Sequence, residues 1–461
     1  MKPFLLPFLP FLAVVTSDNP NLLLGHPLRD QFQLSPGYTN LNHGSYGLAP
    51  KPVLAEQDKV RSSIEANPDK FYRFDIWDAV NQARAAVAHY VGADAEDVVL
   101  LENASEGMNA ILKSLVRPST TVVYLDLAYF MVQETLRYLR DTRDVTLLQV
   151  NTDALFPVRA SGDGESAFES GLVAAVEAAM DDAIAAGREI GLCTFSHVTS
   201  MPSVVLPVAA LAQACKARGA LAVIDGAHVL GNLPGLQVPA LGADVYVSNG
   251  HKWFFTPKGA AFLWVSKALQ GSTAPYAQAG EAVYPTVISN EGSGESSFAK
   301  LFSWEGTKDY GAFLSFPKAL QWRATLGDTP QGGAIYEYLQ KQATQGQGLL
   351  ASAWGTQTLV PSRGANSTAT GRLLNSMAMV ELPAALDCSD PNALGALLLN
   401  NYSKTWSTWV PTVEKSGKCW VRVSAQIYND LTDWESLAAA VSDIAAATSA
   451  AAAAAQHQQN Q

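Results

Sequence analysis

Short apolar runs alternate with longer amphipathic segments through the central part of the chain. The runs have the length of buried strands and lie at 98–101, 122–126, 190–195, 222–225, 245–248 and 260–265. Helical periodicity is found at 52–66, 76–91, 108–115 and 166–186. Strands that alternate with helices form βαβ units. The pattern therefore predicts an α/β fold with a mainly parallel sheet covered by helices on both faces.

The pattern changes after residue 312. From Phe313 a helix leads into a region of mixed strands and helices, which we interpret as a smaller C-terminal α+β domain over 313–447. The large domain is then expected over 36–312, behind an N-terminal segment at 1–35. Residues 448–461 are rich in alanine and glutamine, and this low-complexity tail is expected to be disordered beyond the last helix.

Composition excludes several classes of protein. The chain has 461 residues, 48 % of them hydrophobic and 16 % charged, which is typical of a globular protein. The net charge of −11 and the lack of any Lys/Arg run argue against a nucleic-acid partner. We expect no membrane-spanning segment either, because the apolar run at 1–17 is too short to cross a bilayer.

The location of the protein is a separate question. Residues 1–17 carry one lysine before an apolar run, as a secretory signal does, but three prolines among them oppose a helix. The cysteines lack CxxC spacing, which fits a reducing compartment and no zinc or other metal site; they are Cys193, Cys215, Cys388 and Cys419. We therefore expect a cytoplasmic protein, with export as the alternative.

The most informative stretch is Val245–Val265. Two apolar runs flank a polar turn that begins at Ser248 and carries His251 and Lys252, and aromatic residues follow directly. An amine packed against aromatic rings favours its neutral form, which makes it a better nucleophile toward carbonyl groups. The alternative is an ordinary surface lysine in a turn.

A second stretch, Ala222–Gly231, is an apolar run that ends at Asp225 and continues through a small-residue turn with His228. A carboxylate at the end of a buried strand needs a partner, since an unpaired buried charge is costly. The protonated ring nitrogen of pyridoxal phosphate is one such partner, and a lysine bound covalently to that cofactor is the other half of its signature. Asp225 and Lys252 are separated by about one strand–helix–strand unit.

Together, Val-Ile-Asp-Gly-Ala-His and Ser-Asn-Gly-His-Lys-Trp resemble the pyridoxal-phosphate site of class V aminotransferase-fold enzymes, over roughly 41–440. The resemblance implies a fold-type I enzyme in which Lys252 carries the cofactor and Asp225 holds its pyridine nitrogen. It also implies that His228, Ser248 and His251 contact the cofactor.

A phosphate site is predicted at Glu102–Asn109, where small polar residues end a strand and open a helix. Free backbone N–H groups at a helix start attract anions, although a plain N-cap at Ser105 is the simpler interpretation. The resemblance implies that Ala104, Ser105 and Glu106 cradle the phosphate. Asn103-Ala-Ser is also a glycosylation sequon, and a glycan would not fit in such a cradle, which favours the cytoplasm.

Further cofactor contacts are expected beyond the ends of neighbouring strands. Tyr129 follows the strand at 122–126, where ligands of α/β sheets gather, and is a candidate to stack on the pyridine ring, unless it is a core tyrosine. Thr199 and Ser200 are candidates to bond the phenolic oxygen. Ser196 departs from the residues common in the family, which leaves its role open.

Substrate contacts are expected from several segments. Arg422 alternates with apolar neighbours on a strand, and a buried arginine needs an anion; in fold relatives that anion is the substrate α-carboxylate, the alternative being a salt bridge. The resemblance places Asn42, His43 and Tyr46 at the mouth of the site and makes Arg73 a possible substrate contact.

The resemblance also bears on assembly. In the family, a Gly-Thr at the position of Gly306 and Thr307 reaches the phosphate of the neighbouring subunit. We therefore expect a homodimer that acts on a small-molecule amino-acid substrate.

Several reactions remain open. The motifs are most similar to those of hercynylcysteine sulfoxide lyases of ergothioneine biosynthesis, which predicts a carbon–sulfur lyase. Isopenicillin N epimerase is nearly as similar, but epimerisation needs a second acid, for which His43 and Tyr46 are candidates. Desulfuration needs a nucleophilic cysteine on a loop, and only Cys388 lies in loop-like sequence. A non-catalytic binding module is disfavoured because Asp225, Lys252 and Arg422 are all present.

Overall fold

The computed structural model describes residues 23–158, 164–272, 276–289, 297–361, 371–400 and 407–459. The apolar segment at 1–17 lies outside these residues. The main sheet has seven strands in the order β1-β7-β6-β5-β4-β2-β3. Their bounds are Val98–Leu101 (β1), Thr121–Leu125 (β2), Thr146–Val150 (β3), Ile190–Ser196 (β4), Leu221–Asp225 (β5), Val245–Asn249 (β6) and Ala261–Val265 (β7).

Strands β2 to β6 run parallel, and β7 is antiparallel to both of its neighbours, β6 and β1. The register pairs Ser196 with Asp225, and Asp225 with Val247. The carboxyl ends of β4, β5 and β6 therefore lie side by side. In open α/β sheets this edge is where ligands bind.

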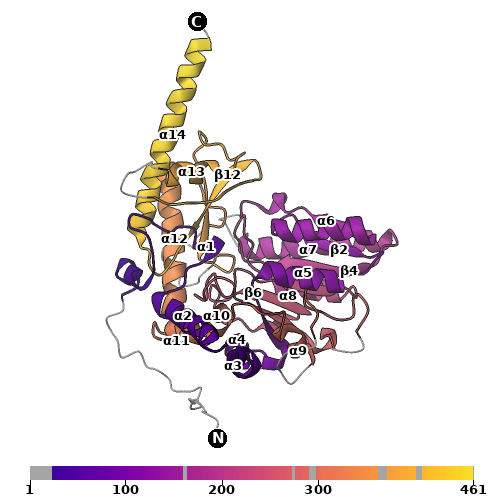
Figure 1. The fold of residues 1–461 in the computed structure, drawn as a ribbon. Coiled ribbons are helices and arrows are strands. Elements are labelled where there is room, and N and C mark those ends of the chain that lie inside the picture. Colours follow the sequence, from indigo (N-terminus) through magenta and orange to yellow (C-terminus); the bar gives the residue numbers. More distant parts are fainter. Residues whose placement is uncertain are drawn as a thin grey trace.

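Helices cover both faces of this sheet (Figure 1), which confirms the predicted fold class. Alternate strand residues belong to two separate cores: Val122 and Val223 pack in one, and Val123 and Ile224 in the other. Both faces are buried, so the strands are continuous apolar runs. The covering helices are α4 (Ile76–Tyr90), α5 (Ala104–Leu115), α6 (Phe130–Arg143), α7 (Gly164–Ala185) and α8 (Val208–Lys216), whereas α2 (Lys51–Ala66) packs against α10 (Gly311–Leu314) and α11 (Phe316–Ala324).

Strand β3 and helix α6 were not predicted from the sequence. Strand β3 lies at the edge of the sheet, and most of its residues are only partly covered. Polar residues at its exposed positions, Thr146 and Gln149, interrupt the apolar run that β1, at the other edge but fully buried, retains.

A second sheet of three antiparallel strands lies in the C-terminal part, in the order β10-β12-β11. Helices α12 and α14 pack beside one another, and α12 packs against β10 (Figure 1). The strands are β10 (Met377–Glu381), β11 (Thr412–Lys415) and β12 (Lys418–Ser424), and the helices are α12 (Ala334–Trp354), α13 (Ala393–Leu399) and α14 (Leu431–Gln459). The smaller α+β region is thus present, although the exact domain limits stay a prediction.

Short elements connect these two parts. They are the 3₁₀ helices at His26–Gln31, Ala95–Asp97, Asp153–Leu155, Val238–Leu241 and Lys267–Leu269, the π-helix Phe71–Asp75, the helices α1 (His43–Tyr46), α3 (Pro68–Lys70), α9 (Ser297–Ser303), α10 (Gly311–Leu314) and α11 (Phe316–Ala324), and the two-residue strands β8 (Asp328–Thr329) and β9 (Gly332–Gly333).

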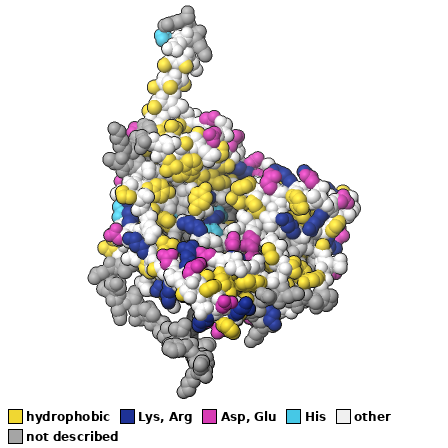
Figure 2. All heavy atoms as spheres, in the orientation of Figure 1, with side chains coloured by type: hydrophobic (Ala, Val, Ile, Leu, Met, Phe, Trp, Pro, Cys, Tyr) yellow, Lys and Arg dark blue, Asp and Glu magenta, His cyan; other side chains and the backbone are white. Residues whose placement is uncertain are grey.

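The alanine-rich tail differs from its prediction. Helix α14 continues to Gln459 as a single rod that projects from the body (Figures 1 and 2). Alanine has the highest helix propensity of all residues, which is why this composition extends the helix. By length and composition alone α14 would also suit a membrane span, but Trp434, Leu437 and Val441 in its first half are fully buried in the protein.

The cysteines also differ from the prediction. Cys388 and Cys419 form a disulfide that ties a loop to β12, whereas Cys193 and Cys215 are free and buried. A disulfide is typical of oxidising compartments. The lack of CxxC spacing, from which we expected reduced cysteines, therefore did not predict the redox state of this pair. The cytoplasmic location stays a prediction.

Candidate active site

A cavity of about 230 Å³ lies at the carboxyl ends of β4, β5 and β6. Its walls come from the main sheet, from the start of α5 and from α1. In Figure 2 a hollow on this face of the molecule shows basic and histidine side chains. The lining residues are Ser45, Tyr46, Asn103, Ala104, Ser105, Tyr129, Met131, Ser196, Val198, Ser200, Asp225, Ala227, His228, Asn249, His251 and Lys252.

Lys252 lies in the turn between β6 and β7, and its Nζ is 3.1 Å from Nε2 of His228. Burial and, to a smaller extent, the charge of Arg422 lower the pKa of Lys252 to about 7, against a smaller opposing effect of Asp225. A substantial fraction of the amine is therefore neutral near pH 7, as a nucleophile toward an aldehyde requires.

Asp225 ends β5 with its carboxyl group at the cavity and only 5 % of the residue exposed. Oδ1 accepts the N–H of Ala227 at 2.9 Å, and burial raises the pKa of this carboxyl group. His228 is buried beside it, and its Nδ1 has no hydrogen-bond partner among the described residues. A buried carboxylate and an unsatisfied imidazole nitrogen at one cavity indicate a polar ligand.

The start of α5 has fewer free backbone N–H groups for an anion than the sequence predicts. The N–H of Ala104 donates to Asn249 Oδ1 at 2.8 Å, and the N–H of Glu106 donates to Asn103 Oδ1 at 2.9 Å. Among the described residues, only the N–H of Ser105 remains without a partner at this helix start. Ala104 and Ser105 line the cavity, so the N–H of Ser105 is the group at this helix start that could donate to an anion there.

Glu106 has another role than the one predicted. Its carboxylate accepts the N–H of Glu102 at 2.8 Å, which closes a capping arrangement at the helix start. Burial and the neighbouring Glu305 raise its pKa to about 7. The side chain therefore stabilises the helix end and does not line the cavity.

Two residues of the Ser-Asn-Gly-His-Lys-Trp motif, Ser248 and His251, point in different directions. His251 lines the cavity while its Nδ1 bonds the carbonyl of Ala260 at 2.9 Å. Ser248 is fully buried, where its Oγ donates to the carbonyl of Gly226 and accepts the N–H of Leu230 at 3.1 Å. Ser248 thus supports the Asp225 turn and has no contact with the cavity, contrary to its predicted cofactor contact.

Arg422 is buried, and the described residues supply it with no carboxylate. Its Nη1 donates to the carbonyl and Oγ of Ser200, at 3.0 and 3.2 Å, and its Nη2 donates to Asn42 Oδ1 and Ser45 Oγ, at 3.0 and 2.7 Å. No described residue bonds its Nε. Burial lowers the pKa of this guanidinium to about 10. A buried cation held only by neutral oxygens is suited to an anionic ligand.

Three predicted ligand contacts are internal instead. Thr199 is fully buried and bonds the carbonyl of Pro202 and the N–H of Val204, so Ser200 is the member of that pair at the cavity. Asn42 supports Arg422. His43 is fully buried with both ring nitrogens bonded, so it does not face a substrate.

Other predicted residues lie at the surface. Arg73 pairs with Asp69 in the exposed π-helix region, with 71 % of its side chain accessible. Thr307 is exposed between α9 and α10, outside the cavity. Tyr46 and Tyr129 do line the cavity, with 74 % and 37 % of their surfaces exposed, as residues at its mouth.

Some lining residues were not predicted. Ser45 was the neighbour of named candidates, and its bond to Arg422 reveals its role. Asn249 lies within the lysine motif, and its side chain reaches Ala104 across the sheet edge. Met131 and Val198 are apolar, and nothing in their sequence context separates them from core residues.

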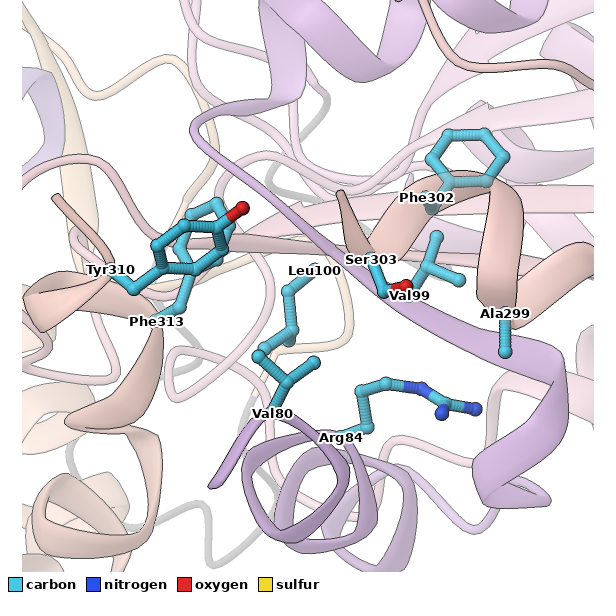
Figure 3. A pocket seen from close by; sticks show the side chains of 9 residues that line it. All are labelled: Val80, Arg84, Val99, Leu100, Ala299, Phe302, Ser303, Tyr310 and Phe313. Carbon is cyan, nitrogen blue, oxygen red and sulfur yellow. The ribbon is translucent and has the colours of Figure 1, made fainter. Parts of the chain in front are cut away.

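Figure 3 shows a second cavity, between β1, α4, α9 and α10. Its volume is about 10 Å³, and its one charged residue, Arg84, already donates to the carbonyls of Val98 and Ala95 and to Glu96. A gap of this size beside a fully bonded arginine is a packing defect and no ligand site.

The cavity at the strand ends fits pyridoxal phosphate. Asp225 suits a protonated ring nitrogen, Lys252 an aldehyde, and Ser105 and His251 a phosphate; the buried unsatisfied nitrogen of His228 marks space for another polar atom. When bound, the cofactor would withdraw electrons from the Cα of an amino acid attached to it.

Comparison with known proteins agrees with this geometry. Residues 170–387 match the family model "Aminotransferase class-V". A protein of Oryza sativa subsp. japonica named "Putative L-cysteine desulfhydrase 1" is 31 % identical, with 89 % of this chain and 84 % of that protein covered. Isopenicillin N epimerase of Amycolatopsis lactamdurans is 29 % identical, with 90 % and 98 % covered.

Solved structures share the fold. C-DES, with glycine covalently linked to its PLP cofactor, superposes with a TM-score of 0.66 at 19 % identity, covering 90 % of this chain and 99 % of that one. A second structure describes C-DES as a cystine C–S lyase in complex with cysteine persulfide. From the family match and the cavity that fits the cofactor, the chain belongs to the class V aminotransferase family and is a pyridoxal-phosphate-dependent enzyme.

Proposed function

We propose that the protein is a carbon–sulfur lyase that acts on cysteine, a cysteine conjugate or its sulfoxide. The reaction breaks the Cβ–S bond and the Cα–H bond, and with one water it yields pyruvate, ammonium and the released sulfur compound. The hercynylcysteine sulfoxide indicated by the sequence motifs is one candidate substrate of this class.

The residues divide the work as follows. Arg422 binds the substrate carboxylate, because this buried cation is bonded to Ser45 and Ser200 of the cavity wall and finds no carboxylate partner among the described residues. Asp225 would hold the ring nitrogen of the cofactor protonated. Lys252 would hold the cofactor through its amine, and the same amine would accept the Cα proton as a general base; a pKa of about 7 suits that role near neutral pH.

The choice of a lyase over a desulfurase rests on the absence of a thiol from the described cavity lining. No cysteine lines it: Cys388 and Cys419 are paired, and Cys193 and Cys215 are buried elsewhere. A desulfurase must capture sulfur on a thiol, whereas a lyase releases it. The names of the rice relative and of C-DES support the same class of reaction.

Epimerisation is the second candidate, supported by the similarity to isopenicillin N epimerase. It needs an acid on the face opposite Lys252. His43 is bonded at both nitrogens, and burial lowers its pKa to about 3, which leaves Tyr46 as the candidate.

The test is an assay with L-cysteine, an S-alkyl cysteine, its sulfoxide and L-alanine, in which pyruvate, ammonium and inversion at Cα are measured together. We expect pyruvate and ammonium in equal amounts from the sulfur compounds and little inversion of alanine. Lys252→Ala should abolish turnover, and the exposed Lys267→Ala should not. Inversion of alanine without pyruvate from any sulfur compound, with loss of inversion in Tyr46→Phe, would favour the epimerase.

We also infer a homodimer in which Thr307 of one subunit completes the phosphate site of the other. Two of the N–H groups at the start of α5 are already bonded inside the chain, and Thr307 is exposed. Mixing inactive Lys252→Ala with a weakened Thr307→Val should restore sites that combine the intact lysine of one subunit with the intact threonine of its partner. No recovery on mixing, or a monomer with full activity, would contradict this assembly.

A further inference from the structure

The turn that carries Lys252 is held at successive backbone carbonyls by side chains from distant parts of the chain. The carbonyl of Lys252 accepts a hydrogen bond from His43 Nε2 at 2.7 Å, and the carbonyl of Trp253 accepts one from Arg323 Nη1 at 2.7 Å. In the same turn Phe255 has a left-handed φ of +67°, which costs a bulky residue about 1 kcal/mol or more. A turn with such a residue depends on outside contacts to keep its shape.

The hydrogen bonds of His43 fix its tautomer. A carbonyl can only accept, so Nε2 carries the hydrogen, and Nδ1 must accept from the hydroxyl of Tyr428 at 2.8 Å. That hydroxyl in turn accepts from Asn40 Nδ2 at 2.9 Å. His43 is fully buried, and burial together with the nearby Lys258 lowers its pKa to about 3 despite the bond to the carbonyl. The ring is therefore neutral at the pH at which proteins normally work.

The same segment also holds the carboxylate-binding strand. Next to His43, Asn42 and Ser45 accept hydrogen bonds from Arg422, and the N–H of Gly44 donates to Ser424 Oγ at 3.1 Å. Gly47 ends the segment so close to the lysine turn that a Cβ there would lie 1.7 Å from the carbonyl oxygen of His251. Residues 40–47 thus lie between the lysine turn and β12, in contact with both.

We propose that His43 is a positioning residue: it directs the Lys252 side chain by holding the Lys252 carbonyl, and through Tyr428 it keeps the lysine turn in register with the strand of Arg422. This rests on the proposed role of Lys252. Imidazole suits the task because one rigid ring offers a donor on one side and an acceptor on the other. The distance between the amine that takes the Cα proton and the cation that holds the carboxylate then depends on this ring.

The first test needs no catalysis. In protein labelled with ¹⁵N-histidine, the His43 signals, assigned by their loss in His43→Gln, should show a neutral ring with hydrogen on Nε2 from about pH 5 to pH 9. A ring protonated near pH 6, or with its hydrogen on Nδ1, would overturn the proposal. This result is independent of whether Lys252 is the cofactor lysine.

The second test compares variants of the cofactor-loaded enzyme. His43→Leu should lower kcat/KM by about tenfold to a hundredfold, as expected for a misplaced reactive group, and should shift the pH midpoint of the cofactor absorbance by about half a unit or more. His43→Gln keeps a donor for the carbonyl and should recover most of both. Tyr428→Phe, which keeps the ring but removes the hydroxyl, should give an intermediate effect.

The matched control is His197→Leu. His197 is also buried and bonded to a tyrosine hydroxyl, Tyr246, at 3.0 Å, but it lies on the wall of another cavity, between α7 and α8. Both leucine variants should lower the unfolding temperature, yet only His43→Leu should move the absorbance midpoint. Equal shifts in both variants, or none in His43→Leu, would reduce His43 to a structural residue. If Lys252→Ala left the absorbance of the bound cofactor unchanged, the assignment of Lys252 would fail instead.

Discussion

Two buried arginines show how this molecule uses the same side chain in opposite ways. Arg323 lies beneath the lysine turn, where its Nε donates to Asp328 Oδ2 at 2.7 Å. Arg422 lies behind Ser45 and Ser200 of the cavity wall; its partners are neutral oxygens, and its Nε has no partner among the described residues. Both guanidinium groups are buried to the same degree.

Their electrostatics differ because of one carboxylate. Burial alone would lower the pKa of Arg323, but Asp328 more than offsets it, and the net pKa is raised. Burial without such a carboxylate lowers the pKa of Arg422 to about 10. Burial of an arginine is therefore no sign of a ligand site; the sign is a buried cation for which the described part of the chain supplies no counter-charge.

The largest difference should appear in catalysis. Arg422→Met removes the cation that holds the substrate carboxylate, so we expect kcat/KM to fall by close to 10⁴-fold, about 5 kcal/mol. The free energy of unfolding should change by less than about 1 kcal/mol, because the cost of an uncompensated buried charge disappears together with its hydrogen bonds. Steady-state kinetics and urea unfolding of the same preparation measure both.

The contrast between the two arginines would be contradicted if Arg422→Met unfolded the protein while the refolded fraction kept its activity. In that case Arg422 would be a structural residue, and its neutral partners would be sufficient to hold it without a ligand.

Arg323→Met should show the reverse. It leaves Asp328 buried beside the hydroxyl of Tyr90 without its cation, which we expect to cost at least about 3 kcal/mol of stability. At a temperature where the variant is still folded, kcat/KM should fall by no more than about tenfold, because the bond to the Trp253 carbonyl is lost but the His43 bond to the Lys252 carbonyl remains. Asp328→Asn should lose less stability, since it removes the charge but keeps an oxygen. If Arg323→Met were as stable as the parent protein, the ion pair would contribute nothing to stability.

The smallest effect concerns pH. Burial and the charge of Arg422 both lower the pKa of Lys252, so the neutral amine gains about tenfold per pH unit up to about pH 7 and then levels off. The rate at which cofactor-free protein takes up pyridoxal phosphate should follow this profile. Removing a positive neighbour favours the protonated amine, so Arg422→Met should move the profile to higher pH, whereas Arg323→Met should leave it in place. Equal profiles in all three proteins would show that Arg422 does not act on Lys252.

The sequence by itself determined the central sheet and the identity of the cofactor. Strands buried on both faces must be apolar at every position, which is why β1, β2, β4, β5, β6 and β7 were predicted within one residue of their observed ends. The approach of Asp225 and Lys252 follows from the same regularity, because parallel strands end at one edge. Strand β3, most of whose residues are only partly buried, carried no such signal.

Only the tertiary structure decided which polar residues face the ligand. Ser248 and Lys252 belong to one motif, yet Ser248 turns into the core to support Gly226, while Lys252 reaches the cavity. His43 resembled a substrate contact until its ring was found between Tyr428 and the Lys252 carbonyl, residues more than 200 positions away. A hydrogen bond depends on distance and direction, which a motif does not contain. Whether a buried polar group serves the fold or a ligand is therefore settled by the partners that the folded chain supplies.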